Sequence, residues 1–159
     1  MNWLCEVSLV ERRDRIMPKI KKTITINAPV ERVFGFMNTP ESLPEIWPSF
    51  VEARDVQRLP NGGAKFRYVY KMAGMRFEGT SEDTEYVPNQ RVVNKSKGGV
   101  EAKQVYTFQP EAGGTKFTWE IEYTVPIPVL GRLAEAIIVR MNEGEAELVM
   151  ANLKARMEA

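Results

Sequence analysis

The sequence predicts an α+β domain in which a curved, seven-stranded antiparallel sheet wraps around a long C-terminal helix, with two short helices between the first and second strands. Three observations carry this prediction. Residues 19–27 and six segments between residues 50 and 125 alternate apolar and polar side chains, as half-buried strands do. Short turns separate those six segments, so that each strand joins the next by a hairpin. Residues 129–158 then carry a helical pattern.

The start of the chain reads as an appendage to this domain. Met17-Pro18 looks like a natural start, placed just before the first patterned segment. We therefore predict an N-terminal extension over residues 1–16 and one folded domain over residues 17–159. Docking of the extension through Trp3, Leu4 and Leu9 is an alternative.

Two short helices follow the first strand. Ala28-Pro29-Val30-Glu31 starts one of them, because proline suits the first helical turn and glutamate there favours the helix dipole. Thr39-Pro40-Glu41 starts the other, with Thr39 as the expected N-cap, and two later prolines keep it short. The apolar stripe of the first helix is formed by Val30, Val33, Phe34 and Met37.

A run of six strands makes up the middle of the chain. Its turns are rich in glycine and asparagine, which accept the positive φ angles that tight hairpins require. The residues of each strand that share the apolar face should point toward the helix. One strand is ambiguous, because Phe77 and Tyr86 fall on opposite faces unless a bulge intervenes. The expected strands are 50–59, 64–72, 75–87, 91–97, 101–109 and 115–125.

The last segment, residues 129–158, predicts a long helix with one apolar face laid across the concave side of the sheet. Gly144 is its only weak point. The residues that recur at helical spacing on this face are Leu130, Leu133, Ile137, Met141 and Leu148.

Composition excludes several classes of function. The 22 Lys and Arg residues balance 21 Asp and Glu residues, and no basic run is long enough to follow a phosphate backbone, so nucleic acid is not an expected partner. The chain has no histidine, which removes the usual general base and the commonest transition-metal ligand. Cys5 is the only cysteine and cannot form an internal disulfide. We expect no metal and no cofactor.

The sequence also indicates where in the cell the protein is expected. No stretch approaches 18 apolar residues, so we expect no stable membrane insertion. The early arginines follow the apolar residues, which is the wrong order for a signal peptide. A reduced cytoplasm is the expected compartment, and the expected state is a monomer or a homodimer.

Several short motifs, in this order, resemble one known family. The stretch from Ile24 to Phe34 resembles the opening of the polyketide cyclase/dehydrase branch of the START/Bet v 1-like (SRPBCC) superfamily, in which a strand, an Ala-Pro and a Val-Phe helix follow one another. The resemblance covers residues 19–158 and implies the helix-grip fold. The further matching motifs are Asn38-Thr39-Pro40-Glu41-Ser42-Leu43-Pro44, Trp47-Pro48, Glu85-Tyr86-Val87-Pro88, Gly113-Gly114-Thr115-Lys116 and Tyr123-Thr124-Val125-Pro126.

The resemblance implies a cavity between sheet and long helix that accepts lipids, sterols, quinones, polyketides or other flat apolar molecules. Strand alternation and the helix stripe choose the residues that would line it, although a filled aromatic core is the alternative. The predicted lining residues are Phe34, Met37, Trp47, Phe50, Phe66, Tyr68, Tyr70, Met72, Phe77, Asn94, Gln104, Tyr106, Trp119, Tyr123, Leu133, Ile137 and Met141.

No clear catalytic set emerges. Arg76 and Glu78 share a strand face and are candidates for an acid/base or orienting pair if they project inward, and Tyr106 is a third candidate. Other acidic pairs are expected on solvated surfaces, namely Glu82 and Asp83, Glu120 and Glu122, and Glu143 and Glu145.

Three hypotheses for function remain open. The first is a non-enzymatic binding protein for a small hydrophobic ligand, such as a lipid, quinone or polyketide-like molecule. The second is a polyketide-type cyclase, aromatase or dehydratase, in which Tyr68, Tyr106, Asn94 and Arg76 position a reactive chain. The third is a protein-interaction module that acts through the helix or sheet surface.

Overall fold

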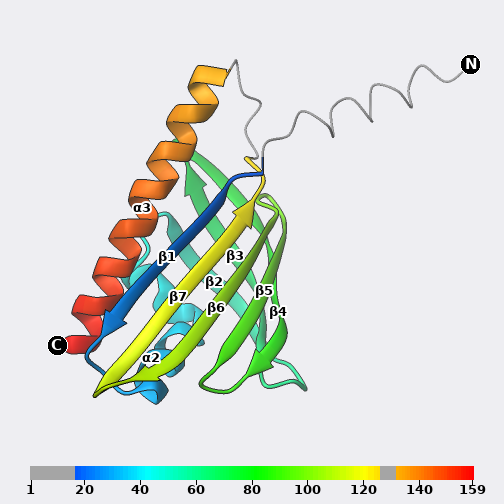
Figure 1. Ribbon diagram of the computed structural model, residues 1–159. Coiled ribbons are helices and arrows are strands. Elements are labelled where there is room, and N and C mark those ends of the chain that lie inside the picture. Colours follow the sequence, from blue (N-terminus) through cyan, green and yellow to red (C-terminus); the bar gives the residue numbers. More distant parts are fainter. Residues whose placement is uncertain (1–16, 126–131) are drawn as a thin grey trace, which may run out of the picture.

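The computed structural model describes residues 17–125 and 132–159, and the predicted extension over residues 1–16 lies outside this range. Seven strands form one sheet, two short helices follow the first strand, and a long helix ends the chain (Figure 1). The elements are β1 (Lys19–Ile26), α2 (Val30–Met37), the 3-10 helix η1 (Pro40–Glu45), β2 (Phe50–Arg58), β3 (Ala64–Met72), β4 (Met75–Val87), β5 (Arg91–Gly98), β6 (Ala102–Glu111), β7 (Gly114–Tyr123) and α3 (Arg132–Glu158).

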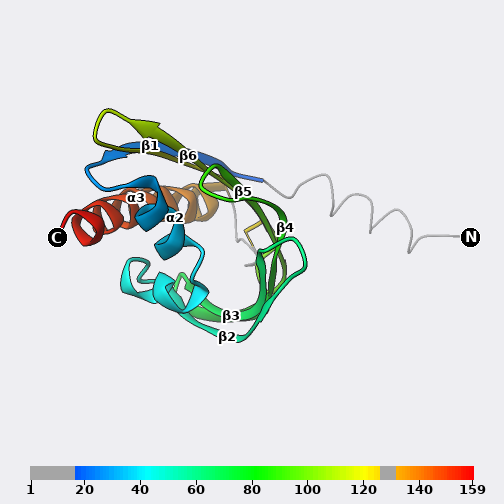
Figure 2. The ribbon, with the colours of Figure 1, turned by 90° about the horizontal axis from the view of Figure 1, so that it is seen from below.

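The sheet order is β1-β7-β6-β5-β4-β3-β2, and every neighbouring pair is antiparallel. Strands β2 to β7 therefore follow one another as hairpins, while β1 lies beside β7 at the far edge. Seen from below, the sheet bends around the helices (Figure 2). This architecture confirms the predicted α+β helix-grip fold.

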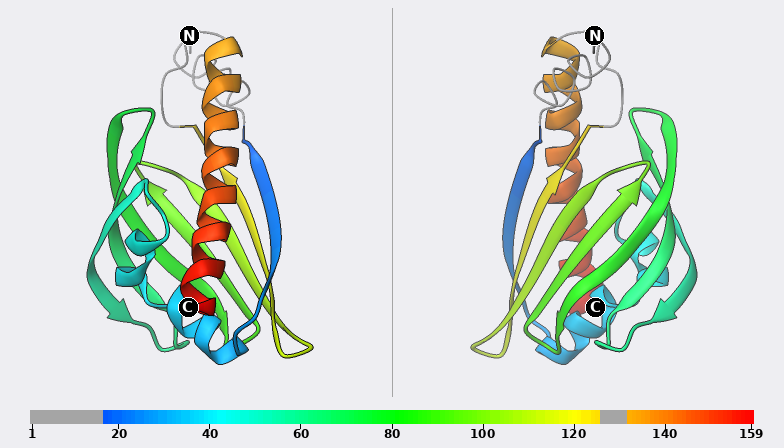
Figure 3. Two further views of the ribbon diagram at one scale, coloured as in Figure 1. Left: turned by 90° about the vertical axis from the view of Figure 1, so that its left-hand side faces the viewer. Right: turned by 90° about the vertical axis from the view of Figure 1, so that its right-hand side faces the viewer.

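Helix α3 runs along β1 and crosses the open side of the curved sheet (Figure 3). Its buried side chains belong to the same apolar core as the inward residues of the strands and of α2. No helix in the described residues is long and apolar enough to cross a membrane. The buried side chains of α3 are Ala146, Val149, Met150, Leu153 and Met157.

The inward face of α3 was predicted wrongly: Leu130 lies outside the described residues, and the other four predicted residues are exposed, including Leu148 at 47% in the second half. Leu133, Ile137 and Met141 are 77%, 53% and 58% exposed, so they do not line the interior. At 3.6 residues per turn, Ile137 lies roughly 180° around the helix from Ala146, whose side chain is buried. The helix therefore carries two apolar stripes on opposite sides, and spacing alone does not tell which one meets the sheet.

The two short helices lie where they were predicted, with a difference in capping. Val33, Phe34 and Met37 of α2 are buried, as the apolar stripe predicts. The second element is a 3-10 helix, and Thr39 does not cap it. Its hydroxyl instead donates a hydrogen bond of 2.8 Å back to the carbonyl of Gly35, one turn earlier.

A bulge resolves the ambiguous strand β4. Its pairing with β5 shifts register between Asp83 and Glu85, which changes the face of the residues that follow. The Tyr86 ring consequently packs edge-on against Phe34, with ring centroids 5.4 Å apart. On the other side of the bulge, Ser81 and Asp83 are buried.

Candidate functional site

A partly open cavity lies between the concave face of the sheet and the middle of α3, with α2 and η1 at one end. Its volume is about 90 Å³, counted as the space open to the centre of a water-sized sphere. One water molecule needs roughly 10–15 Å³ on that measure, so the cavity has room for a small organic molecule. Its aromatic and polar lining includes Trp47, Tyr68, Tyr70, Asp83, Asn94, Gln104, Tyr106, Trp119, Tyr123, Asn142 and Glu145.

Most of the residues that the sequence predicts for the lining do border the cavity. Phe34 and Phe77 do not: Phe34 is buried between Tyr86 and Phe108, and Phe77 is only half-buried. The predicted residues that line the cavity are Met37, Trp47, Phe50, Phe66, Tyr68, Tyr70, Met72, Asn94, Gln104, Tyr106, Trp119 and Tyr123.

Aromatic rings form much of the wall. Trp47, in the segment after η1, contacts Trp119 of β7 edge-on, with ring centroids 5.0 Å apart. It also meets the ring of Tyr70 at 5.6 Å. Trp119 stacks in turn on Tyr106, its cross-strand partner on β6, at 6.5 Å. Flat apolar surfaces set at different angles suit a planar, largely apolar ligand.

A line of hydrogen-bonded side chains crosses β4 and β5 beside these rings. Asp83 and Asn94 are cross-strand partners, and the Asn94 amide Nδ2 donates to Asp83 Oδ1 at 2.9 Å. The backbone N–H of Ala64 donates to the other carboxyl oxygen of Asp83 at 2.8 Å. The Ser81 hydroxyl donates to Asn94 Oδ1 at 2.7 Å. The sequence interpretation missed Asp83, because it placed both members of the Glu82–Asp83 pair on the surface.

Burial raises the pKa of the Asp83 carboxyl above its usual range, because desolvation disfavours the charged form. The hydrogen bonds from Asn94 and Ala64 oppose this effect but do not cancel it. An acid with a raised pKa inside a cavity is a candidate proton donor. Both of its oxygens are nevertheless used to hold β3, β4 and β5 together.

Gln104 continues the polar line on β6. It pairs with Asn94 across the sheet, and only 9% of its surface is exposed. Its Oε1 accepts one hydrogen bond from the Tyr106 hydroxyl at 2.9 Å and another from Trp119 Nε1 at 3.0 Å. Burial raises the pKa of Tyr106, so its phenol stays protonated and keeps donating.

Tyr68 lines the cavity, but its hydroxyl forms hydrogen bonds with the backbone. It accepts from the N–H of Val100 and donates to the carbonyl of the same residue, both at 2.8 Å. The ring reaches that turn by passing over Gly79, where an added Cβ would stand 2.4 Å from the hydroxyl oxygen. Glycine is therefore required at this position, and the hydroxyl of Tyr68 is structural.

The side of the cavity next to α3 carries Asn142, which sequence reasoning did not select, and Glu145, which it wrongly placed with Glu143 on a solvated surface. Asn142 Nδ2 donates to the Tyr123 hydroxyl at 2.8 Å. Glu145 accepts a hydrogen bond of 2.9 Å from the backbone N–H of Ser49. Burial, and secondly the nearby Glu145 carboxylate, raise the pKa of Tyr70. Helical periodicity would have found both residues only if the buried stripe had been known.

Arg76 and Glu78 do not reach the cavity. Their side chains are 53% and 48% exposed and form an ion pair of 3.0 Å on the outer face of β4. The guanidinium hydrogen bond lowers the pKa of Glu78. The predicted acid/base pair is therefore a surface pair. Within residues 17–125 and 132–159, no group of three or more cysteines and carboxylates is placed to hold a metal ion.

Comparison with known proteins gives a family and a fold. The family described as "Polyketide cyclase / dehydrase and lipid transport" matches residues 17–158. No curated protein sequence matches the chain.

Solved structures share the fold at low sequence identity. A protein from Thermus thermophilus superposes with a TM-score of 0.75 at 22% identity, over 88% of this chain and 97% of that one. A START superfamily protein from Mycobacterium smegmatis gives 0.73 at 16% identity, over 88% and 97%. The Zhui aromatase/cyclase from a Streptomyces species gives 0.68 at 15% identity, over 91% and 98%.

Proposed function

This chain belongs to the polyketide cyclase / dehydrase and lipid transport family, and we propose that it binds a small, flat, hydrophobic molecule in the cavity between its sheet and α3. The observation that carries the proposal is the cavity itself. A space of about 90 Å³ remains between aromatic side chains that are otherwise closely packed. Protein interiors seldom keep such a space without a use, because unfilled volume forfeits dispersion contacts.

The chemistry of the wall supports a binding role over a reactive one. The polar atoms of Tyr68 and Asp83 already form hydrogen bonds with backbone groups and a neighbouring side chain. The surface that remains is aromatic, with a few polar groups that can fix the orientation of a ligand. We therefore propose a carrier or sensor that acts without catalysis.

Native mass spectrometry of the protein purified from its own host tests this proposal. The same sample is measured again after denaturation. We expect an added mass that is lost when the protein unfolds, and its fragmentation identifies the ligand's chemistry. A bare native mass, followed by no binding in a screen of lipids, quinones and aromatic polyketides, would contradict the proposal.

A second candidate function is polyketide-type cyclisation or dehydration. It is favoured by one observation, namely that the Tyr106 hydroxyl and the Asp83 carboxyl, which has a raised pKa, border the same cavity. The structural similarity to the Zhui aromatase/cyclase from a Streptomyces species supports the same idea. Here the Tyr106 hydroxyl, which donates its own proton to Gln104, would position a reactive poly-β-ketone chain by accepting a hydrogen bond from an enol hydroxyl of the chain.

The test is turnover of a synthetic poly-β-ketone thioester into cyclised product. Under this second function, Tyr106→Phe lowers the rate at least tenfold, because a positioning hydrogen bond contributes about 1.4 kcal/mol or more. Tyr86→Phe is the control, since Tyr86 packs on Phe34 away from the cavity lining. Equal rates for wild type and Tyr106→Phe, or no product at all, would remove this candidate.

We also propose a cytoplasmic location and a monomeric or homodimeric state. The lone Cys5 supports a reduced compartment, since no internal disulfide can form. Cell fractionation tests the location, and light scattering coupled to size-exclusion chromatography tests the assembly.

A further inference from the structure

One amide in the cavity wall has its orientation fixed by its neighbours. Trp119 Nε1–H can only donate, and it lies 3.0 Å from Gln104, so the atom of Gln104 that it meets must be the oxygen. The Tyr106 hydroxyl donates to the same oxygen at 2.9 Å. Tyr106 follows Gln104 by two positions on β6, and Trp119 is the diagonal neighbour of Gln104 on β7, which explains how one oxygen reaches both.

Both of these hydrogen bonds go to the oxygen of the Gln104 amide, so its nitrogen takes part in neither of them. Within the described residues its Nε2 has no hydrogen-bond partner, although Gln104 is only 9% exposed and borders the cavity. The oxygen of the facing Asn94 already accepts a hydrogen bond from Ser81, and its nitrogen donates to Asp83. Because Gln104 borders the cavity, its free N–H is met there by water, and a ligand that displaces this water keeps the N–H group satisfied only if it supplies an acceptor oxygen.

The charge of the cavity wall decides what kind of oxygen this is. The described residues that line the cavity include two carboxyl groups, those of Asp83 and Glu145, and neither lysine nor arginine. A carboxylate or phosphate on the ligand would enter without a counter-charge and close to acidic side chains, which is unfavourable. A neutral carbonyl oxygen accepts from the amide without that cost.

We propose that Gln104 Nε2 donates a hydrogen bond to a neutral carbonyl oxygen of the ligand, so that the cavity selects aromatic ketones or quinones over hydrocarbons and over carboxylates. This inference rests on the proposed binding function and names the ligand class for the same cavity. The adjoining Trp119 and Tyr106 rings supply the flat surface next to that oxygen. Gln104 thus acts as a specificity-determining residue, and Tyr106 and Trp119 hold its amide in place.

Calorimetric titration with three probes of similar shape tests the assignment. The probes are 2,3-dimethyl-1,4-naphthoquinone, 2,3-dimethylnaphthalene and 2-naphthoate. We expect the quinone to bind about tenfold more tightly than either of the others, which is the effect of one buried neutral hydrogen bond. The quinone carries methyl groups at both reactive ring positions, so that it does not alkylate the protein.

The matched variants are Gln104→Glu and Gln109→Glu. The first keeps an acceptor for Tyr106 and Trp119 but replaces the donor NH₂ by oxygen, and the preference for the quinone should disappear. The second makes the same change on the exposed side of β6 and should leave the preference as it is in the wild type. Thermal unfolding of each variant reports whether it folds.

The results distinguish failure of the assignment to Gln104 from failure of the proposed binding function. Equal binding of quinone and hydrocarbon to the wild type, or tighter binding of naphthoate, overturns the assignment to Gln104 and leaves the binding function in place. If none of the three probes binds, the assignment falls, and a bare native mass then removes the binding function as well.

A measurement on the wild type covers the case in which Gln104→Glu does not fold. The side-chain amide protons of Gln104 in a ¹⁵N-edited NMR spectrum should move further downfield with the quinone than with the hydrocarbon, because only the quinone accepts a hydrogen bond from them. Equal shifts with both probes overturn the assignment.

Discussion

The two halves of α3 are held to the rest of the molecule in different ways. In the second half, from Glu145 onward, the side chains that face the sheet are buried, and Leu153 is completely so. In the first half, none of the residues from Leu133 to Gly144 is buried, and Ile138, which packs against the core, is only partly covered. One helix is therefore anchored at its C-terminal end and only lightly covered at its N-terminal end. Its middle borders the cavity through Asn142 and Glu145.

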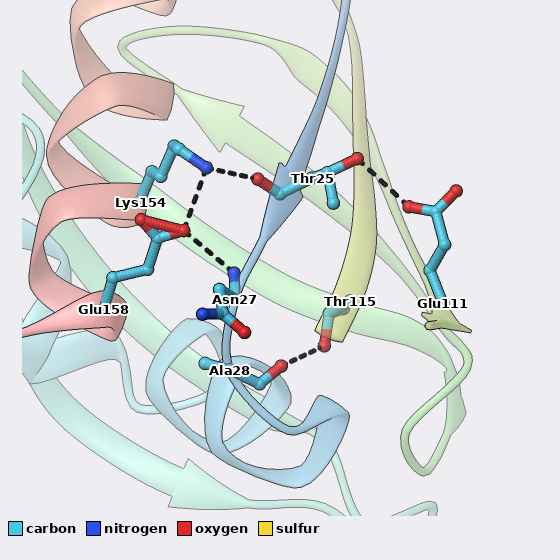
Figure 4. Close-up of polar contacts among 7 residues, drawn as sticks. All are labelled: Thr25, Asn27, Ala28, Glu111, Thr115, Lys154 and Glu158. Atoms are coloured by element: carbon cyan, nitrogen blue, oxygen red, sulfur yellow. Dashed lines mark hydrogen bonds and ion pairs between the residues drawn. The ribbon is translucent and has the colours of Figure 1, made fainter. Parts of the chain in front are cut away.

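Polar contacts reinforce the anchored half on both of its sides. Toward β1, Lys154 donates to the Thr25 carbonyl at 2.7 Å, and Glu158 accepts from the Asn27 N–H at 2.9 Å (Figure 4). Toward η1, Asn152 donates to the Ile46 carbonyl at 3.0 Å. These contacts tie the helix to the edge strand and to the end of the cavity. The difference between the halves teaches that the helix can be secured at one end while its middle remains free to border a cavity.

The largest expected effect comes from truncating the anchored face. Leu153→Ala should lower the free energy of unfolding by about 2–5 kcal/mol, because it leaves a cavity in a fully buried position. Ile138→Ala, which truncates the core-facing side of the first half, should cost clearly less than Leu153→Ala, because the Ile138 side chain is only partly buried. Urea denaturation measures both. Similar losses for the two variants would show that the halves are not held differently.

Gly144 lies between the two halves and should respond to a helix-forming residue. An added Cβ meets no atom within 4 Å, so Gly144→Ala should stabilise the protein by about 1 kcal/mol through helix propensity. Thermal unfolding measures the gain. Gly62→Ala is the contrasting control, because φ is +94° there and the Cβ would stand 2.9 Å from the Tyr86 ring, so that variant should lose stability. A loss in Gly144→Ala would indicate that the junction needs to bend.

The smallest expected effect concerns the carboxyl at the end of the anchored half. The Asn27 N–H, and then the Lys154 side chain, lower the pKa of Glu158 in the folded protein. Between the lowered folded value and the unfolded value, the unfolded state binds more protons, so this contribution to stability is present above the unfolded pKa and is lost as the pH falls through the folded one. Glu158→Gln should flatten the pH dependence of unfolding slightly below about pH 4.5.

NMR titration of the Glu158 carboxyl checks this prediction directly. An unshifted midpoint would mean that the contact with Asn27 is not maintained in solution. Because Glu158 is exposed, added salt should weaken its pairing with Lys154.

Strand patterning could be read from the sequence because it has a local cause. In β3, Phe66, Tyr68 and Met72 turn their side chains to the interior, and the alternation with polar neighbours shows this directly. The bulge in β4 could only be named as a condition for Tyr86 to face inward. Its position after Asp83 depends on how β4 pairs with β5, which no pattern within β4 alone reports.

The cavity's apolar wall was predictable for the same reason, whereas its polar arrangement was not. Gln104 stood among the predicted lining residues, but the double use of its oxygen depends on Tyr106 and Trp119 meeting it across β6 and β7. Asp83 looked like half of a solvated acidic pair until the register of β3 and β4 placed it inside.

The sequence by itself determined the order of strands and helices, the hairpin connections and the apolar faces of most strands, because these follow from side-chain alternation and from turn residues that are neighbours along the chain. Only the tertiary structure decided which side of α3 is buried, which acid lies inside and where an amide donor is left free. Those features depend on contacts between residues far apart in sequence, and two apolar stripes of equal periodicity differ only in what they meet after folding.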